Sequence, residues 1–522
     1  MLPLLVAASL AVSAPPVVAI RSGQLRGALI NKDGAASIAV FKGIPYARPP
    51  IGDLRWREPL RAVPWTAVRE ATTFGAPCAQ NATGRVLESS SEDCLYLNVW
   101  TAEWPLRSPK PVLVWLHGGG NFGGTASDVN SSGEHLARRG LVVVTLNYRL
   151  GPFGFFAHPA LTRESAHHAS GNYGLMDQIA ALRWVHDNIG SFGGDPSRVT
   201  LGGQSAGAVD VNVVMTSPLA KGLFHRAIAQ SGTVSRVADD ATIRMTGLAT
   251  TMAARSGDTY SDALTLVEAE RAGAEVGDNP RALSTAALLQ AASGARKSIG
   301  PANGIIVDGW VLPESPAETF IHGREHRVPL LVGSNARERT PDVTGDALVA
   351  AAKSMYGPLA DRALALYGFS NATTDALYGT VGAQWVVDTM YRCPVVMQQA
   401  WHAAAGNRAY QYQFDRAPPG REAVGATHGV ELPYVFGVTG ARWVDADRAI
   451  SEAIQTYWAN FATSGNPNLP TRSSSLPEWP TFTASTPRYM DFTDSGPIAR
   501  AGLRRPYCDL YLDNITRLRR LR

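Results

Sequence analysis

The chain has 522 residues, of which 45% are hydrophobic and 18% are charged, so it can bury a large globular core. Its net charge of +4 is small, and basic residues cluster only at 517–522. The sequence therefore lacks the basic stripe with interleaved aromatic residues that is typical of nucleic-acid-binding proteins, and we expect the C-terminal arginines to form a solvated helix face. It contains no internal repeat or low-complexity segment.

The N-terminal segment, residues 1–14, is apolar and ends in small residues, as secretory signal peptides do, and is too short to span a bilayer. We expect residues 1–19 to be a signal peptide, cleaved after Ala14 or Ala19, followed by a single domain over residues 20–522 that is secreted or periplasmic. A cut after Ala19 would trim a predicted first strand. The alternative is that the segment forms a buried N-terminal strand. No later stretch is apolar enough for a membrane helix.

Strands and helices alternate along the rest of the chain. Apolar, β-branched runs predict buried parallel strands, and apolar residues at helical spacing predict a helix at 174–189. The stretch at 236–300 is rich in Ala, Leu, Glu and Arg and predicts helices inserted between strands. Alternating strands and helices indicate one doubly wound α/β sheet. The other predicted elements are strands at 112–116, 141–147, 198–202, 226–230, 328–333 and 409–414, and a helix from about 206.

The four cysteines, Cys78, Cys94, Cys393 and Cys508, allow three pairings, among which their spacing does not choose. None belongs to a Cys-x-x-Cys pair, so we expect neither a metal site nor a redox site. An even number of cysteines behind a signal-like segment predicts structural disulfides formed in an oxidising compartment.

A Gly-x-Ser-x-Gly motif at 203–207 contains the main candidate nucleophile, Ser205. The motif alone is weak evidence, but here an apolar strand leads directly into it and a helix follows. A serine nucleophile of this type sits on a sharp, strained strand-to-helix turn that closes only when its neighbours are small. The helix N-terminus also favours the negative charge that develops beside it. The pattern therefore predicts nucleophilic catalysis by Ser205.

A glycine-rich loop at 117–124 follows a predicted strand and satisfies Gly-x-Gly-x-x-Gly at Gly118, Gly120 and Gly123. A dinucleotide-binding fold would place an acidic residue about 20 residues further on to hold the ribose. No Asp or Glu occurs at 135–163, which argues against that class. The loop fits an oxyanion hole better, because glycines let backbone N–H groups approach the carbonyl oxygen of a substrate.

The chain resembles the type-B carboxylesterases, an α/β-hydrolase family that includes the cholinesterases and many microbial esterases and lipases. The resemblance runs from Phe41 to Cys508 and implies an α/β-hydrolase fold, with a central, mostly parallel, twisted sheet flanked by helices and helical insertions. The segments that carry it are Phe41-Lys-Gly-Ile-Pro-Tyr-Ala, Ser91-Glu-Asp-Cys-Leu-Tyr-Leu-Asn-Val-Trp, Asn147-Tyr-Arg-Leu-Gly, Gly171-Asn-Tyr-Gly-Leu-Met-Asp-Gln and Phe192-Gly-Gly-Asp-Pro.

The resemblance implies the partners of Ser205. Gly333-Ser-Asn-Ala-Arg-Glu338 resembles the acid motif of the family, which makes Glu338 the acid, although Arg339 stands where the family usually has Gly. The segment 427–437 resembles the histidine loop, which makes His428 the base, and the chain order of serine, acid and histidine suits this fold. Asp308 is the nearest alternative acid, but its surroundings favour a turn.

The same resemblance implies supporting roles for further residues. The backbone N–H groups of Gly119, Gly120 and Ala206 would form the oxyanion hole, and Gln204, Ser231 and Glu431 would lie behind the triad. Two disulfides, Cys78–Cys94 and Cys393–Cys508, are implied, together with two structural ion pairs, Arg149–Asp177 and Arg55–Glu92.

These features predict a serine carboxylesterase that forms an acyl-enzyme on Ser205 and needs no metal or cofactor. Its partner would be a small ester substrate, and we expect a monomer. Gln204 is neutral where the family usually has Glu, and residues 79–93 contain no Trp, so we expect a preference for non-cationic esters. Asn121 stands where the family commonly has Phe, which would open or polarise the oxyanion end of the gorge.

Three alternatives remain at this point. The chain could be a lipase, a specialised detoxifying esterase for bulky multi-ester compounds, or a non-catalytic binding member of the family. The presence of Ser205, Glu338 and His428 argues against the last.

Overall fold

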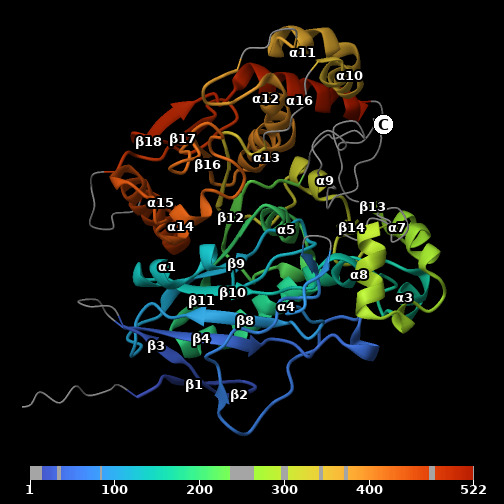
Figure 1. Cartoon of the computed structure of the whole chain (residues 1–522), viewed down its shortest axis with the longest axis vertical. Coiled ribbons are helices and arrows are strands. Elements are labelled where there is room, and N and C mark those ends of the chain that lie inside the picture. Colours follow the sequence, from blue (N-terminus) through green and yellow to red (C-terminus); the bar gives the residue numbers. More distant parts are fainter. Residues whose placement is uncertain are drawn as a thin grey trace, which may run out of the picture.

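The computed structural model describes residues 14–31, 37–82, 85–234, 264–294, 304–339, 345–369, 374–468 and 476–520. Figure 1 shows a large central sheet with helices on both faces, and further helices (α10 to α13 and α16) packed together beyond one end of it. A three-stranded sheet, β1-β2-β5, lies near the N-terminal end of the chain.

Eleven strands of the described chain form the central sheet, in the order β18-β17-β16-β15-β12-β11-β9-β10-β8-β4-β3. The middle of the sheet, from β17 to β10, is parallel, and both margins are antiparallel. Its strands are β3 (Ala28–Ile30), β4 (Ile38–Pro45), β8 (Tyr96–Trp100), β9 (Lys110–Leu116), β10 (Val142–Leu146), β11 (Gly194–Gln204), β12 (Arg226–Gln230), β15 (Leu330–Asn335), β16 (Ala409–Phe414), β17 (Arg488–Thr493) and β18 (Gly496–Ala501). The short strands outside it are β1 (Val17–Ile20), β2 (Gly23–Arg26), β5 (Arg69–Glu70), β6 (Asn81–Ala82), β7 (Arg85–Val86), β13 (Leu264–Thr265) and β14 (Ile306–Val307).

Helices cover the sheet on both faces because its strands are apolar on both faces. Along β9, Val112 and Val114 pack into the core shared with α4 and α5, whereas Leu113 and Trp115 pack into the core shared with α1, α14 and α15. A third core joins α10 to α13 with α16. The helices are α1 (Glu134–Arg138), α2 (Gly151–Gly154), α3 (Pro159–Glu164), α4 (Tyr173–Asn188), α5 (Ala206–Val214), α7 (Leu266–Gly273), α8 (Thr285–Gly294), α9 (Pro316–Ile321), α10 (Gly345–Tyr356), α11 (Ala360–Tyr367), α12 (Val381–Val387), α13 (Cys393–Ala404), α14 (Leu432–Phe436), α15 (Asp445–Ser464) and α16 (Arg505–Arg520).

The strands and helices predicted from apolar patterns are confirmed within a few residues. The predicted helix at 174–189 is α4, and the strand expected at 198–202 is the second half of β11, which begins earlier, at Gly194. Of the helices expected at 236–300, α7 and α8 lie in the described part, while 235–263 and 295–303 lie outside the described residues.

The two ends of the chain differ in how far they are described. Residues 1–13 lie outside the described residues, and β1, which follows them, pairs with β2. A cut after Ala19 would remove Val17 to Ala19 from β1. At the other end, Arg517, Arg519 and Arg520 lie in the last turn of α16, on its partly exposed side, around the buried Leu518.

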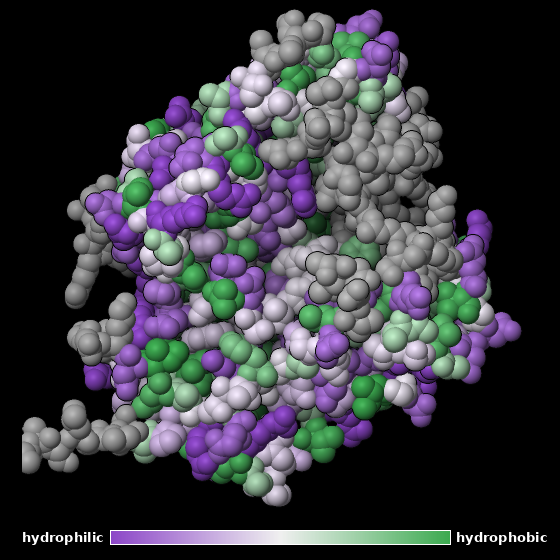
Figure 2. Space-filling model, in the orientation of Figure 1, coloured by the Kyte–Doolittle hydropathy of each residue, from purple (hydrophilic) through white to green (hydrophobic). Residues whose placement is uncertain are grey.

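Hydrophilic and hydrophobic residues are intermixed over the face of the molecule shown in Figure 2. Of the helices in the described residues, none combines the length and the apolar character needed to cross a membrane.

Candidate active site

Ser205 lies at the turn between β11 and α5, with φ of 58° and ψ of −123°. A positive φ is strained for a residue with a side chain, so the surrounding structure must hold the turn. The Ser205 N–H donates to the carbonyl of Gln230 at the end of β12 (2.8 Å), and the Ser205 carbonyl accepts from the N–H of Ala208 (3.0 Å). The strand, turn and helix predicted around the motif are therefore present.

The two glycines of the motif allow the turn to close. A Cβ on Gly203 would lie 2.5 Å from the carbonyl of Gly207, and a Cβ on Gly207 would lie 2.3 Å from the carbonyl oxygen of Leu116. Both approaches are to backbone atoms, which cannot move aside as a flexible side chain would. The motif thus brings α5 against the end of β9, directly before the glycine-rich loop.

The His428 imidazole lies between Ser205 and Glu338. Its Nε2 is 2.7 Å from Ser205 Oγ, and its Nδ1 is 2.6 Å from Glu338 Oε2. Glu338 is fully buried, and the imidazole is 16% exposed. These distances are those of a nucleophile, a base and an orienting acid linked in series.

The loop after β15 fixes Glu338 by backbone contacts. The N–H of Asn335 donates to Glu338 Oε1 (2.7 Å), which leaves Oε2 for the imidazole. The N–H of His428 donates to the main-chain carbonyl of Glu338 (3.1 Å). Glu338 and His428 are therefore joined through their backbones as well as their side chains.

Arg337, the residue before Glu338, anchors this loop to its neighbours. It is 7% exposed, and within the described chain its guanidinium donates to main-chain carbonyl oxygens alone, namely those of Leu377, Ala423, Asp375 and Ala376. These carbonyls belong to two other loops, so one guanidinium fastens three segments together.

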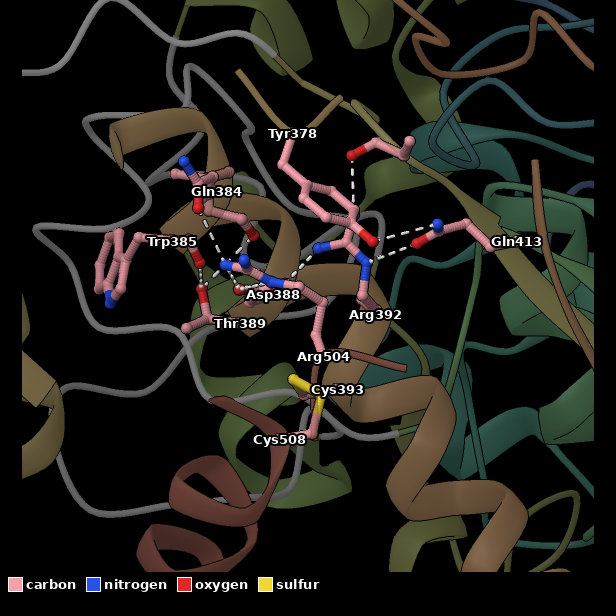
Figure 3. A network of polar contacts seen from close by, with 12 residues as sticks. Tyr378, Gln384, Trp385, Asp388, Thr389, Arg392, Cys393, Gln413, Arg504 and Cys508 are labelled. Atoms are coloured by element: carbon pink, nitrogen blue, oxygen red, sulfur yellow. Dashed lines mark hydrogen bonds and ion pairs between the residues drawn. A yellow bond between two sulfur atoms is a disulfide. The ribbon is translucent and has the colours of Figure 1, made fainter. Parts of the chain in front are cut away.

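Arg392 also supports this loop, and Figure 3 shows the network of polar contacts around its guanidinium. Its Nη2 donates to the carbonyl of Ala336 (2.7 Å), its Nε donates to Gln413 Oε1 (3.1 Å), and its Nη1 pairs with Asp388. Arg504 pairs with the other oxygen of Asp388 (2.8 Å). Asp388 and Arg392 bound a π-helical turn, η8 (Asp388–Arg392), between α12 and α13.

Glu431 ties the histidine loop to the sheet. Its Oε2 accepts from Asn335 Nδ2 (2.6 Å), and its Oε1 accepts from Gln230 Nε2 (3.2 Å). Asn335 Nδ2 also donates to the carbonyl of Thr427, directly before His428 (2.7 Å). Burial raises the pKa of Glu431, and the nearby Glu338 carboxylate raises it further.

Gln204 and Ser231, predicted to lie behind the triad, differ in their contacts. Gln204 Nε2 is 3.3 Å from His428 Nε2, so this neutral side chain borders the imidazole directly. Ser231 is buried with φ of 57°, and its N–H donates to the carbonyl of Gly333, but its hydroxyl forms no hydrogen bond within the described chain. The side chain that donates to Glu431 Oε1 is instead that of Gln230, which the sequence did not indicate.

The predicted oxyanion donors border Ser205. A Cβ on Gly118 would lie 3.0 Å from Ser205 Cβ, so the glycine-rich loop passes directly beside the serine. Within the described part of the chain, the N–H groups of Gly119, Gly120 and Ala206 donate to no protein acceptor. Gly119 is exposed and has φ of 112°, and Ala206 is the first residue of α5, where helix N–H groups have no intrahelical partner.

Known proteins similar to this chain are ester hydrolases. A family model described as "Carboxylesterase family" matches residues 14–356 and 359–511. Fumonisin B1 esterase of Sphingopyxis macrogoltabida is 35% identical over 86% of this chain and 82% of its own length. Carboxylesterase 1D of Rattus norvegicus is 36% identical over 87% of this chain and 86% of its own length. The solved structure of PNB esterase has a TM-score of 0.74 at 30% identity, covering 95% of this chain and all of that one.

The chain belongs to the carboxylesterase family. It is a carboxylic ester hydrolase, and the predicted α/β-hydrolase fold is confirmed by the sheet and by the similarity to PNB esterase. The dinucleotide-binding alternative is therefore excluded.

The structural pairs implied by the resemblance are present in this carboxylesterase. The disulfides are Cys78–Cys94 and Cys393–Cys508. Both ion pairs form, Arg149–Asp177 at 2.8 Å and Arg55–Glu92 at 2.6 Å. Asp308 accepts the N–H groups of Trp310 and Leu312, as expected for a turn residue, and also the Asn172 amide.

Two features of the esterase site were not foreseen. The side chain of Asn121 is only 1% exposed and donates to Asp210 Oδ1 (2.9 Å), so it is directed into the protein. Tyr391 packs beside His428, with ring centroids 5.4 Å apart, and its hydroxyl accepts from Arg339 Nε (3.3 Å). Among the described residues, no cluster of His, Cys, Asp and Glu is suited to hold a metal ion.

Proposed function

We propose that this carboxylesterase hydrolyses its esters through an acyl-enzyme, with Ser205 as nucleophile, His428 as general base and Glu338 as the acid that orients the imidazole. The observation that carries the proposal is the placement of His428 between Ser205 Oγ (2.7 Å) and Glu338 Oε2 (2.6 Å). Each group is in hydrogen-bonding reach of the next, which proton transfer requires.

The reaction proceeds in two steps. His428 Nε2 takes the Ser205 proton as the hydroxyl oxygen attacks the ester carbonyl, and the imidazolium then protonates the departing alcohol. Water attacks the acyl-enzyme by the same route and releases the acid. Glu338 keeps the proton of the neutral imidazole on Nδ1 and stabilises the imidazolium. No metal or cofactor takes part.

The negative oxygen of the tetrahedral intermediate is bound by the N–H groups of Gly119, Gly120 and Ala206. Their lack of protein acceptors within the described chain and their position beside Ser205 support this role. Preorganised donors of this kind contribute roughly 3 kcal/mol each to stabilisation of the transition state.

The preferred substrates are non-cationic esters. The neutral Gln204 lies 3.3 Å from His428 Nε2, where a carboxylate would attract a cationic alcohol group. A second observation agrees with this preference. The cationic Arg339 contacts Tyr391, which packs against His428.

A second candidate function is that of a specialised esterase for one bulky substrate. It is supported by the similarity to a fumonisin B1 esterase. Comparing kcat/KM for fumonisin B1 with that for short acyl esters of a simple phenol separates the two. A general esterase prefers the phenyl esters, and a specialised one prefers fumonisin B1.

The two disulfides support export to an oxidising compartment, the extracellular space or the periplasm. Each disulfide forms by a two-electron oxidation of two thiols, for which such a compartment supplies the oxidant. The substrate is then an ester met outside the cytoplasm.

Replacement of the nucleophile tests the proposal. Ser205→Ala should fold normally but lose turnover of an activated ester by roughly 10⁵–10⁶-fold, together with labelling by a fluorophosphonate probe. The matched control is Ser191→Ala, which removes an exposed serine hydroxyl bonded to the carbonyl of Ala19 and should retain both activities. Undiminished turnover by Ser205→Ala would refute the proposal. A wild-type chain that neither reacts with the probe nor hydrolyses any ester would instead be a binding member of the family.

A further inference from the structure

Asp210 is a buried carboxylate with no cationic partner among the described residues. It lies on α5, is fully buried, and its two oxygens accept from two amides, Oδ1 from Asn121 Nδ2 (2.9 Å) and Oδ2 from Gln178 Nε2 (2.6 Å). No Arg or Lys of the described chain pairs with it. Burying an unpaired carboxylate costs stability, so the core alone gives no reason for an acid here.

Asn121, the partner of Asp210, is the residue that follows the oxyanion glycines. Three hydrogen bonds hold it in a positive φ of 60°. Its Nδ2 donates to Asp210, and its main-chain carbonyl accepts from the N–H of Gly151 (2.6 Å). Its Oδ1 (3.2 Å) shares the Tyr148 hydroxyl proton with the nearer main-chain carbonyl of His117 (2.8 Å). The position of Gly120 is therefore set by an asparagine that cannot rotate freely.

The bond between Asn121 and Asp210 joins two separate segments that carry oxyanion donors. Gly119 and Gly120 belong to the loop after β9, whereas Ala206 begins α5. Asp210 lies one helical turn after Ala206 on the same helix. The separation between the two sets of donors is thus fixed by a side-chain contact that spans them.

We propose that Asn121 and Asp210 form a clamp that positions the oxyanion hole, so that both are positioning residues for ester hydrolysis. This inference rests on the proposed function, because it assigns the oxyanion hole to Gly119, Gly120 and Ala206. A displacement of donors by about 1 Å is enough to slow such a reaction by 10²-fold, and the effect falls on the transition state rather than on substrate binding.

Protonation of Asp210 adds a pH signature to the clamp. Burial raises its pKa to about 7, and the hydrogen bonds from Asn121 and Gln178 oppose that rise. The other titratable groups facing this cluster are Tyr148, whose pKa burial raises, and His117, stacked on Tyr148, whose pKa burial lowers to about 4. A protonated Asp210 has one O–H in place of an acceptor. The bond from Asn121 is then lost and the clamp loosens below neutral pH, unless the Gln178 amide turns its Oε1, which has no partner in the described chain, toward that O–H.

A swap of the two side chains tests the clamp. Asp210→Asn leaves an NH₂ group facing either the Asn121 or the Gln178 amide, and Asn121→Asp places two carboxylates in contact. The double variant, Asn121→Asp with Asp210→Asn, restores all three side-chain bonds, and only the bond between residues 121 and 210 changes its direction. The carboxylate at 121 accepts from Tyr148 and from the amide at 210, whose oxygen accepts from Gln178.

We expect Asp210→Asn to lower kcat 10- to 100-fold and Asn121→Asp to lower it more, with KM within threefold of wild type. The double variant should recover to within about fivefold of wild type. The inhibition constant of an aryl trifluoromethyl ketone, which forms a hemiketal oxyanion on the serine, should rise in step with the loss of kcat. The acid limb of the pH–rate profile should become shallower in Asp210→Asn, because the ionisation of Asp210 no longer contributes to it.

Asp308→Asn is the matched control, since it alters another buried pair in which an asparagine, Asn172, donates to a carboxylate (3.0 Å). It should lower the melting temperature and leave kcat within twofold. The clamp is refuted if Asp210→Asn loses only thermal stability, or if the double variant folds but is no more active than Asp210→Asn. The second criterion applies even when Asn121→Asp alone does not fold. Retained turnover in Ser205→Ala would refute the proposed function itself, whereas failure of the swap with an inactive Ser205→Ala refutes only the clamp.

Discussion

The two sides of Ser205 are held in place by different chemistry. Around Glu338 and His428, the buried guanidinium groups of Arg337 and Arg392 fasten the loops to one another. On the opposite side, toward the glycine-rich loop, the central group is the carboxylate of Asp210, which amides and a phenol surround and which pairs with no cation in the described part of the chain.

This difference in chemistry determines how the contacts on each side respond to pH. A guanidinium remains charged at every pH at which the protein folds, so the loops around Glu338 keep their bonds. The bonds around Asp210 change when that carboxyl group takes up a proton, and burial raises the pKa of the group to about 7. The guanidinium contacts on one side of Ser205 are therefore insensitive to pH, whereas the carboxylate contacts on the other side respond within the physiological range.

The largest effect should come from Glu338→Gln. The amide oxygen would take the N–H of Asn335, so the NH₂ group would face His428 Nδ1 and force the proton onto Nε2. The imidazole could then no longer accept the Ser205 proton, and kcat should fall by about 10⁴-fold. The measurement is kcat with an activated ester at pH 8. Glu314→Gln, which alters an exposed glutamate paired with Arg324, should change kcat less than twofold. A loss below tenfold in Glu338→Gln would mean that Glu338 does not orient the base.

Removal of Arg337 should have the next largest effect. Arg337→Ala leaves buried carbonyl groups in two loops without their donor, so the free energy of unfolding should fall by about 3–5 kcal/mol, measured with urea. Arg324→Ala, which breaks an exposed ion pair, should cost no more than about 1 kcal/mol. Equal losses of unfolding free energy in the two variants would contradict the view that buried guanidinium groups hold the loops around Glu338.

The smallest effect should come from Gln204, which lies between the two sides. The wild type should hydrolyse a choline ester and its uncharged 3,3-dimethylbutyl isostere with similar kcat/KM. Gln204→Glu should shift this ratio about tenfold toward the choline ester, because the new carboxylate attracts the cation. High salt should reduce the shift. A strong choline preference in the wild type would overturn the proposed specificity.

Prediction from the sequence succeeded where the signal was local. The strand, turn and helix around Ser205 occupy consecutive residues, and the glycines of 203–207 are required by backbone approaches within that segment. Apolar patterns likewise predicted β9, β10 and α4. Glu338 and His428 were assigned by resemblance, because no periodicity relates residues that meet only through the loops at the sheet edge.

The supporting contacts were missed for a physical reason. Arg337 and Arg392 donate to main-chain carbonyls, which every residue carries, so no side-chain pattern reports them. Asn121 and Asp210 are 89 positions apart. One signal was available, since Asp210 is the charged residue in the run of α5, Ala-Gly-Ala-Val-Asp-Val-Asn-Val-Val, in which only Asn212 is also polar. An acid in such a run indicates a specific partner.

The pairing of Asn121 with Asp210 also constrains how the sequence can change. Either substitution alone leaves a buried donor or a buried charge unmatched, whereas both together can restore the match. The two positions therefore form an epistatic unit, and a change at one alters which residues are tolerated at the other. An engineer who grafts the glycine-rich loop from a relative with Phe at position 121 has to redesign residue 210 on α5 in the same step.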